Sequence, residues 1–237
     1  KVMTGTPGSD LLFINEHFDA ASVTPAQLDM LLADGWRHFG THFYRYSLNI
    51  HSDEIVRVMP LRIRLADLEL SKSQRRVLRR NDDLAVTFGP ATITDEVHDL
   101  FDRHKDRFDH SVPDSIYDFL SRGPATVPVE CKQITARDAE GRLLATSFFD
   151  VGVTGTSATY GCFDPDETRR SLGIFTMLKV IEHSIASGKA FYYHGYAYDA
   201  PSFYDYKFGF SALEAFDWDG NWKYFSQREH RGHRADE

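Results

Sequence analysis

The sequence predicts an α+β fold, and three features of its second half carry that prediction. Three runs have the composition of strands and are separated by turn residues: 129–137, 143–153 and 157–163. Residues 171–187 place apolar side chains at i, i+3, i+4, i+7 and i+11, the spacing of an amphipathic helix. Residues 190–196 then form an apolar strand. We therefore expect a mixed sheet with flanking helices over residues 71–226, preceded by a smaller α/β region over residues 1–70.

In the N-terminal region we expect one short helix and then strands. Residues 25–33 have helical character, and Thr24 is a suitable N-cap. The aromatic and partly alternating stretch 36–48 predicts a strand pair, or a strand and a loop. Residues 56–65 alternate as a strand, which Pro60 would confine to a sheet edge or a bulge because proline lacks a backbone N–H.

The middle of the chain alternates between helices and a strand. The expected elements are a helix at 71–81, a strand at 84–88, and helices at 94–107 and 113–120. A last strand pair is expected around Trp218, Trp222 and Tyr224. The Gly/Thr/Ser-rich residues 1–10 are predicted to be frayed, and the polar tail 227–237 is predicted to be disordered. This order of strands, turn and helix is that of an acyl-CoA N-acyltransferase-like core, in which a helix N-terminus at a splayed sheet binds phosphate.

Composition excludes several classes of protein. Of the 237 residues, 42% are hydrophobic and 26% are charged, which is ordinary for a globular protein with a packed core. Only Cys131 and Cys162 occur, so neither a disulfide framework nor a cysteine-based metal site is expected. No apolar run approaches the roughly 20 residues of a membrane helix, and the N-terminus lacks a signal-peptide pattern. We expect a cytoplasmic protein with no membrane partner, no metal and no cofactor.

A basic helix face stands out against the net charge of −8. Five side chains at i, i+3, i+4, i+7 and i+8 project from one side of the 71–81 helix: Lys72, Arg75, Arg76, Arg79 and Arg80. No acidic residue is interleaved to relieve their repulsion, so the face is a candidate site for a phosphate backbone. The alternative is an ordinary solvated face.

A second candidate anion site lies at the start of the 171–187 helix. Its members are Arg169, Arg170, Ser171 and Gly173. Unpaired N–H groups and the helix dipole favour an anion there. The alternative is a surface cap in which the arginines pair with the acidic turn at residues 164–167. Bulky Phe175 stands where a coenzyme A-binding loop usually has a small residue, which makes coenzyme A a weaker donor candidate.

The most conspicuous acid is Asp150, which lies in an otherwise apolar strand. A carboxylate among aromatic side chains has a raised pKa unless it is paired, so Asp150 is a candidate general base. The alternative is a strand-end residue bonded to the backbone. Tyr160, Asp164 and Lys207 are weaker candidates for the same chemistry. The sequence contains no nucleophile-elbow motif for Ser-His-Asp catalysis.

Four blocks of the chain resemble the arginyl-tRNA–protein transferase family, including its bacterial leucyl-transferring members. They are Leu61-Arg62-Ile63 followed by Ser71-Lys72-Ser73-Gln74-Arg75-Arg76 through Arg80-Asn81, Leu100-Phe101-Asp102-Arg103-His104 through Phe119-Leu120, Tyr160 and Phe163-Asp164-Pro165 through Arg170-Ser171-Leu172-Gly173, and Tyr192-Tyr193 through Gly195-Tyr196 with Tyr206-Lys207. Together these blocks cover most of residues 55–210, and the combination is far more specific than any one of them.

The resemblance implies a reaction in which a protein N-terminal amine attacks an aminoacyl ester on tRNA. The partners would be an aminoacyl-tRNA, with arginine or leucine the first candidates, and a protein or peptide with a free amine. The basic helix face would contact tRNA, and the 169–173 segment would lie near the aminoacylated end. Asp150, Tyr160 and Asp164 would be the catalytic candidates. The substrate-binding candidates would be Tyr193, Tyr196, Tyr206 and Lys207.

One region departs from the family pattern. The family usually carries a cysteine cluster where residues 46–60 stand, and this segment contains none; Ser47, His51 and Ser52 lie near the expected positions. We expect no cluster-dependent regulation, and a different acceptor, such as a small peptide or a metabolite amine, stays open. Two other functions also stay open: a coenzyme A-dependent N-acyltransferase and a non-catalytic tRNA- or peptide-binding descendant.

Overall fold

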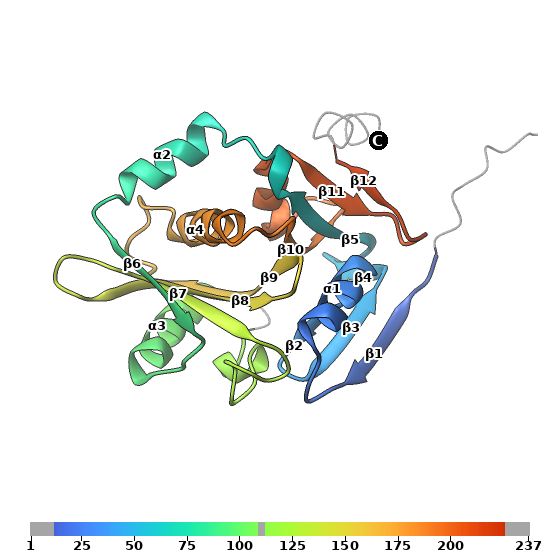
Figure 1. Ribbon diagram of the computed structural model, residues 1–237, viewed down its shortest axis with the longest axis horizontal. Coiled ribbons are helices and arrows are strands. Elements are labelled where there is room, and N and C mark those ends of the chain that lie inside the picture. The colour runs from blue at the N-terminus through green and yellow to red at the C-terminus, as the bar shows by residue number, and fades with distance from the viewer. Residues whose placement is uncertain (1–11, 109–111, 226–237) are drawn as a thin grey trace, which may run out of the picture.

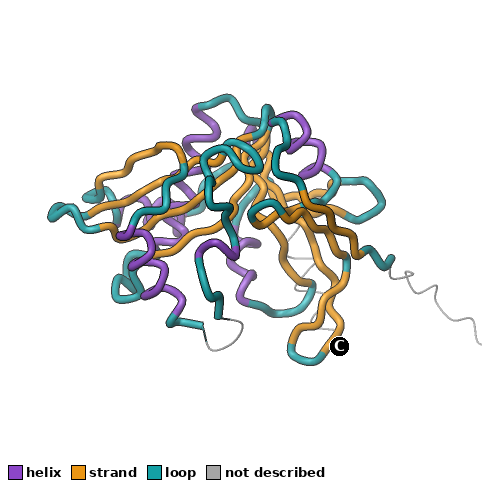
Figure 2. The backbone as a smooth tube through the Cα atoms, turned by 90° about the horizontal axis from the view of Figure 1, so that it is seen from below, coloured by secondary structure: helices purple, strands orange, loops and turns teal. Residues whose placement is uncertain are grey.

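A nine-stranded mixed sheet forms the centre of the molecule in the computed structural model, which describes residues 12–108 and 112–225 (Figure 1). Its order is β12-β11-β5-β10-β9-β8-β7-β6, with β4 also paired to β5. The strands are β4 Leu48–His51, β5 Glu54–Arg64, β6 Ala85–Pro90, β7 Cys131–Arg137, β8 Leu143–Val151, β9 Gly155–Phe163, β10 Phe191–Tyr198, β11 Leu213–Phe216 and β12 Trp222–Tyr224. Figure 2 shows the twist of this sheet from a second direction.

The two neighbouring strands β9 and β10 are parallel and separate partway along their length. They pair only from Phe191 opposite Gly155 to Tyr193 opposite Ser157. Beyond those residues β9 stays paired with β8, and β10 stays paired with β5. The sheet therefore splays into a wedge between the second halves of β9 and β10.

Helices cover both faces of the sheet. They are α1 Pro25–Ala33, α2 Lys72–Arg80, α3 Asp95–Lys105 and α4 Leu172–Ala186, with short 3₁₀ helices η1 Leu65–Asp67, η2 Ile116–Asp118 and η3 Phe203–Gly209. Helices α2 and α4 lie on one face and α3 on the other (Figure 1). Alternation along β8 shows why: Phe149 packs with Leu178 of α4, whereas Phe148 packs with Phe101 of α3. None of the helices in the described ranges is long and apolar enough to cross a membrane.

A second, three-stranded sheet stands beside α1 in the N-terminal region, in the order β1-β3-β2. Its strands are β1 Asn15–Asp19, β2 Arg37–Phe39 and β3 His42–Tyr46. The side chain of Thr24 caps α1 through a capping box with Gln27. Leu28 of α1 is fully buried in a cluster with Tyr193 of β10, so this region packs on the large sheet.

The α+β prediction is confirmed, and most predicted elements are present within two or three residues of their expected bounds. The predicted helix at 113–120 is wrong, because only the single turn η2 forms there. The side chain of Ser115 accepts from the N–H of Tyr117, and that of Asp118 accepts from the N–H groups of Asp114 and Ser115. These short polar side chains bond the backbone locally and compete with a longer helix.

The predicted edge position of the strand around Pro60 is also wrong. Strand β5 is internal, with β10 on one side and β4 and β11 on the other. On the latter side the paired residues are 54–57 and 61–63, so Pro60 falls in the gap between the two partners. The missing N–H is tolerated there. Strand β1 was not expected from the sequence. The predictions for residues 1–10 and 227–237 concern segments that lie outside the described residues.

The predicted division into a region ending at residue 70 and a catalytic domain from residue 71 stays a prediction. Strands β4 and β5 of the first part pair within the large sheet of the second part. The long-range contacts of β5 with β10 and β11 therefore join the two parts through backbone hydrogen bonds.

Candidate functional site in the wedge between β9 and β10

Arg37 of β2 points into the wedge from the N-terminal sheet. Its Nη2 donates to the carbonyl oxygen of Ala158, the first residue of β9 beyond the paired segment. Its Nη1 is buried and has no hydrogen-bond partner among the described residues. A buried guanidinium nitrogen without an acceptor is costly, so the group is available to a ligand that supplies one.

Lys207 reaches the same place from η3. Its side chain is buried, and its Nζ donates to the carbonyl oxygen of Tyr196 at 2.6 Å. The ammonium also lies 4.5 Å from the ring centroid of Tyr204. Burial, together with the positive charge of Arg37, lowers the pKa of Lys207 to about 7.

His194 of β10 completes a group of three basic side chains. It is buried, and neither ring nitrogen has a hydrogen-bond partner in the described part of the chain. Burial and the nearby charges of Lys207 and Arg37 lower the pKa of His194 well below its ordinary value, so its imidazole is neutral. The register of β10 against β5 shifts between Tyr193 and Gly195, which places His194 at a β-bulge.

The predicted substrate-binding tyrosines surround this group in different ways. Tyr196 donates its hydroxyl to the carbonyl oxygen of Gly35 at 2.6 Å and is buried. Tyr193 is buried against α1, with its hydroxyl 3.5 Å from Nη1 of Arg62. Tyr206 is exposed on η3. The tyrosines on β10 therefore support the strand, and Tyr206 faces solvent.

Asp150 is buried on β8 and fully engaged. Its Oδ2 lies 3.0 Å from Nε2 of His38 and accepts from the hydroxyl of Thr159 at 2.7 Å. The other ring nitrogen of His38 lies 2.9 Å from the carbonyl oxygen of Gly40, so both ring nitrogens face oxygen atoms. Burial acts to raise the pKa of Asp150, but His38, Thr159 and Arg37 together hold it below its ordinary value.

The other two catalytic candidates lie beyond the wedge. Tyr160 stacks on Phe119 with ring centroids 4.1 Å apart, and its buried hydroxyl has no partner among the residues described. Burial raises its pKa. Asp164 accepts from Nη1 of Arg103 at 2.6 Å and from the N–H of Asp166 at 3.0 Å. These bonds hold the turn after β9.

The basic helix face forms as the spacing predicts. Ser71 and Gln74 make a capping box that starts α2. All five basic residues are exposed: Lys72, Arg75, Arg76, Arg79 and Arg80. Over residues 12–108 and 112–225 none of the five forms an ion pair, although Arg75 donates to Leu70 O and Arg80 to Arg169 O. The face is a dense positive surface with no internal neutralisation.

The start of α4 combines a bonded arginine with an unusual backbone. Arg170 forms a bidentate pair with Asp83, each bond 2.8 Å long, and a third bond of 3.1 Å to Glu167. Arg169 has an exposed side chain, and Ser171 has φ +54° and makes no side-chain cap. A Cβ on Gly173 would meet the ring of Phe163 at 3.0 Å, so the glycine allows close packing of α4 on β9. Arg170 thus acts as part of the surface cap, pairing with Glu167 and Asp83.

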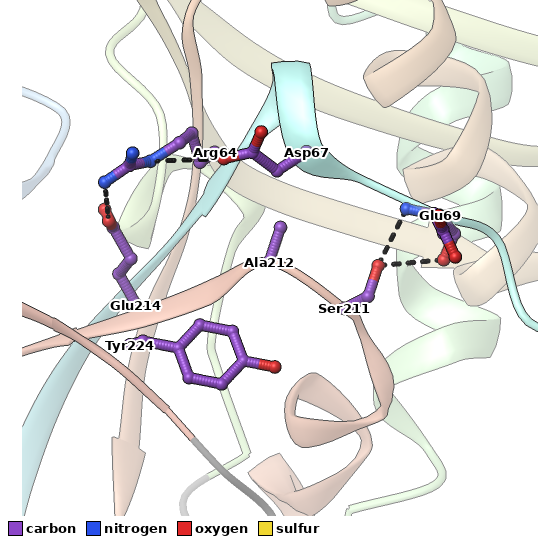
Figure 3. A pocket seen from close by; sticks show the side chains of 7 residues that line it. All are labelled: Arg64, Asp67, Glu69, Ser211, Ala212, Glu214 and Tyr224. Atoms are coloured by element: carbon purple, nitrogen blue, oxygen red, sulfur yellow. Dashed lines mark hydrogen bonds and ion pairs between the residues drawn. The ribbon is translucent and has the colours of Figure 1, made fainter.

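An open hollow of about 430 Å³ lies away from the wedge, near the start of β11 (Figure 3). Its lining includes an ion pair of 2.5 Å between Arg64 and Glu214, and the bond of 2.8 Å between Glu69 N–H and Ser211 Oγ. Glu214 also pairs with Arg62 at 2.6 Å, and the guanidinium of Arg62 lies over the ring of Phe191. Arg62 therefore belongs to the packing of the sheet and does not extend the basic face of α2.

The splayed parallel pair and the helix that follows β9 define an N-acyltransferase type of fold. Among solved structures, FemX matches with a TM-score of 0.47 and 12% identity, covering 79% of this chain and 65% of that one. A GCN5-related N-acetyltransferase from Kribbella flavida matches with a TM-score of 0.37 and 12% identity, covering 70% and 56%.

Sequence comparison gives the family. Residues 96–217 match the model of the arginine-tRNA-protein transferase C terminus. An aspartate/glutamate leucyltransferase of Nitrosococcus oceani is 30% identical over 208 residues, covering 85% of this chain and 84% of that protein. One from Paramagnetospirillum magneticum is 33% identical over 172 residues, covering 71% and 69%. The chain belongs to the arginine-tRNA-protein transferase family.

Sequence reasoning missed three members of the wedge: Arg37, His38 and His194. Arg37 and His38 lie 121 and 112 residues from their partners Ala158 and Asp150, and no local pattern reports such contacts. The sequence did contain a signal for His194. A glycine inside an apolar strand often marks a bulge, and Gly195 follows His194 directly.

Proposed function

We propose that this chain transfers leucine from leucyl-tRNA to the α-amine of a polypeptide that begins with aspartate or glutamate. Its family makes it an aminoacyl-tRNA-dependent transferase. The choice of leucine and of an acidic acceptor follows the names of the relatives. The observation that carries the proposal is the wedge itself, an opening in the sheet of a transferase-family chain, bordered by basic groups whose buried nitrogens include Nη1 of Arg37 and both ring nitrogens of His194 without a partner in the described residues.

The reaction requires little beyond positioning and polarisation. The amine nitrogen bonds to the ester carbonyl carbon, the carbon–oxygen bond to the terminal ribose breaks, and a proton from the amine passes to the released ribose hydroxyl. Donors directed at the carbonyl oxygen stabilise the negative charge that develops there. We assign the wedge to the reacting ends and the α2 face to the tRNA body, because the five exposed cations suit a phosphate backbone.

We assign Asp150 a positioning role. Its carboxylate is bonded to His38, the residue that follows Arg37 on β2. This pair fixes β2 against β8 and therefore sets where Arg37 enters the wedge. Tyr160 and Asp164 support the end of β9, and Arg169 and Ser171 stay candidates for contact with the tRNA acceptor end.

The test is a transfer assay with separately charged tRNAs. Leucyl-tRNA and arginyl-tRNA, each with a labelled amino acid, are offered with peptides that begin with Asp, Glu or Lys. We expect label on the Asp and Glu peptides with leucyl-tRNA. Acetyl-CoA with the same peptides is the matched donor control. Acetyl transfer without aminoacyl transfer from any tRNA would overturn the proposal, and arginine transfer alone would replace leucine as the donor.

A further inference from the structure

We propose that Arg37 and Lys207 form a carboxylate-binding site that receives the side chain of the acceptor's first residue. These two residues would then set acceptor specificity. This inference rests on the proposed function. Neither residue belongs to the basic face of α2, and they lie in different parts of the chain, on β2 and η3.

The two cations border one small space beside Gly195. A Cβ on Gly195 would lie 3.5 Å from Nζ of Lys207 and 3.6 Å from Nη2 of Arg37. The φ of +93° at Gly195 is one that other residues rarely adopt. Because a Cβ is bonded directly to its Cα, these two distances place Nζ of Lys207 and Nη2 of Arg37 close together beside the backbone of Gly195.

No counter-ion for either cation is present in the described residues. Neither Arg37 nor Lys207 forms an ion pair with a carboxylate in residues 12–108 and 112–225. The nearby carboxylate of Asp150 is bonded to His38 and Thr159. Lys207 is buried and Arg37 is half-buried with its Nη1 unbonded, and two neighbouring cations of this kind are stabilised by an incoming anion.

The direction of approach favours the acceptor over tRNA phosphate. On β10, Tyr193 packs against α1 of the N-terminal region, whereas the adjacent Tyr192 packs in the cluster that includes α4. Strand β2, which begins at Arg37, lies with the N-terminal sheet on the other side of the large sheet from α2 and α4 (Figure 1). A planar guanidinium and an ammonium that lie side by side match a carboxylate.

The first experiment compares peptides that begin with Asp and with Asn, which have nearly the same shape and differ in charge. For the wild-type chain and for Arg37→Gln and Lys207→Gln, kcat/KM is measured with each peptide and leucyl-tRNA. We expect either variant to reduce the Asp-over-Asn ratio by about 10- to 100-fold, the worth of a hydrogen bond between charged groups. Arg76→Gln on α2 is the matched control, which lowers both values together and leaves the ratio unchanged.

The second experiment does not depend on turnover. Calorimetry measures binding of the Asp and Asn peptides to the wild-type chain and to Arg37→Lys, which keeps the charge but removes the planar fork. We expect the wild type to prefer the Asp peptide and Arg37→Lys to retain part of that preference. Equal binding of both peptides by the wild type, or an unchanged ratio in Lys207→Gln, would overturn the site. Preferential binding of the Asp peptide without amino-acid transfer from any tRNA would instead contradict the proposed function and support the carboxylate-binding site.

Discussion

Lys207 is a basic side chain that folding removes from water and places near a second cation. In the folded chain its pKa is about 7, against an ordinary value of 10.5. Between these values the unfolded chain binds a proton that the folded chain does not, so this group makes stability rise as pH increases from about 7 to 10.5. The titratable groups around Lys207 do not make stability rise with pH in this range. His194 is neutral in the folded chain, and burial raises the pKa values of Tyr196, Tyr204 and Tyr206, which keeps these hydroxyls protonated.

The prediction is that Lys207→Met flattens the pH dependence of stability. The free energy of unfolding is measured with denaturant from pH 7 to pH 9.5 for both chains. One proton contributes at most about 1.4 kcal/mol per pH unit, so the difference between the two slopes is at or below that value. Parallel curves for the two chains would show that Lys207 titrates normally.

At the residue scale, the sequence could identify a conspicuous group but not its partners. Asp150 stood out as an acid in an apolar strand, yet its chemistry depends on His38, 112 residues away. A raised pKa was expected only for an unpaired carboxylate. His38 is the partner that holds the pKa of Asp150 below its ordinary value. Lys207 stood out as a weaker candidate for the same chemistry and as part of a family block, and nothing local indicated its burial.

Helix α2 shows how an element can present charge without compensation. Arg76 and Arg79 are exposed and form no ion pair in the described part of the chain, whereas Arg75 and Arg80 each donate to a backbone carbonyl. We predict that Arg76→Gln with Arg79→Gln lowers the slope of log affinity against log salt for tRNA by about 1 to 2, because each phosphate contact contributes about 0.7 to 0.9.

Filter or fluorescence titrations at several salt concentrations measure that slope. The matched control is Arg45→Gln with Lys223→Gln, which removes the same charge at two sites already paired with acids. The control should leave the slope unchanged. If both double variants gave the wild-type slope, the α2 face would be a solvated surface that tRNA does not contact.

At the element scale, local chemistry explains which predictions held. Helix α1 and helix α2 follow from caps and spacing that lie within the segment itself. The prediction for 113–120 failed because Ser115 and Asp118 satisfy the backbone within one turn. The edge alternative for Pro60 failed because the positions of β4 and β11 along β5 are set by tertiary pairing, which leaves a gap at the proline, whereas a bulge does lie beside it, in the pairing of β5 with β10.

The whole molecule is joined across its N-terminal and catalytic parts by packing as well as by β5. Leu28 of α1 is fully buried against the large sheet, while Met30 on the same helix is 73% exposed. We predict that Leu28→Ala lowers the free energy of unfolding by about 2 to 5 kcal/mol, as expected for a buried leucine. Met30→Ala is the matched control and should change stability by less than about 0.5 kcal/mol.

Denaturant unfolding followed by tryptophan fluorescence and by circular dichroism checks this prediction. With Trp218 and Trp222 replaced by phenylalanine in both chains, the fluorescence of Trp36 reports on the N-terminal region, and the circular dichroism reports mainly on the large sheet and its helices. Coincident transitions that shift together in Leu28→Ala would show one cooperative unit. Two separate transitions, of which Leu28→Ala shifts only the one followed by fluorescence, would show that the N-terminal region unfolds by itself.

At the scale of the whole chain, the sequence predicted the class of fold because β7, β8, β9, α4 and β10 follow one another and pair with near neighbours. The family blocks supplied the reaction class, and the comparisons confirm the family. The wedge lay beyond prediction, since it depends on where the pairing of β9 and β10 stops and on an arginine from another sheet.

The length of strand β5 also fixes the separation between two parts of the chain. One end follows β4 on the side of the N-terminal sheet, and the other passes through η1 toward α2. Eleven residues at about 3.3 Å each make a span of roughly 35 Å between these ends. A stiff strand of fixed length therefore separates the part of the chain that carries Arg37 from the part that carries the basic helix. Removing a single residue would shorten this span and turn every following side chain to the opposite face of the sheet.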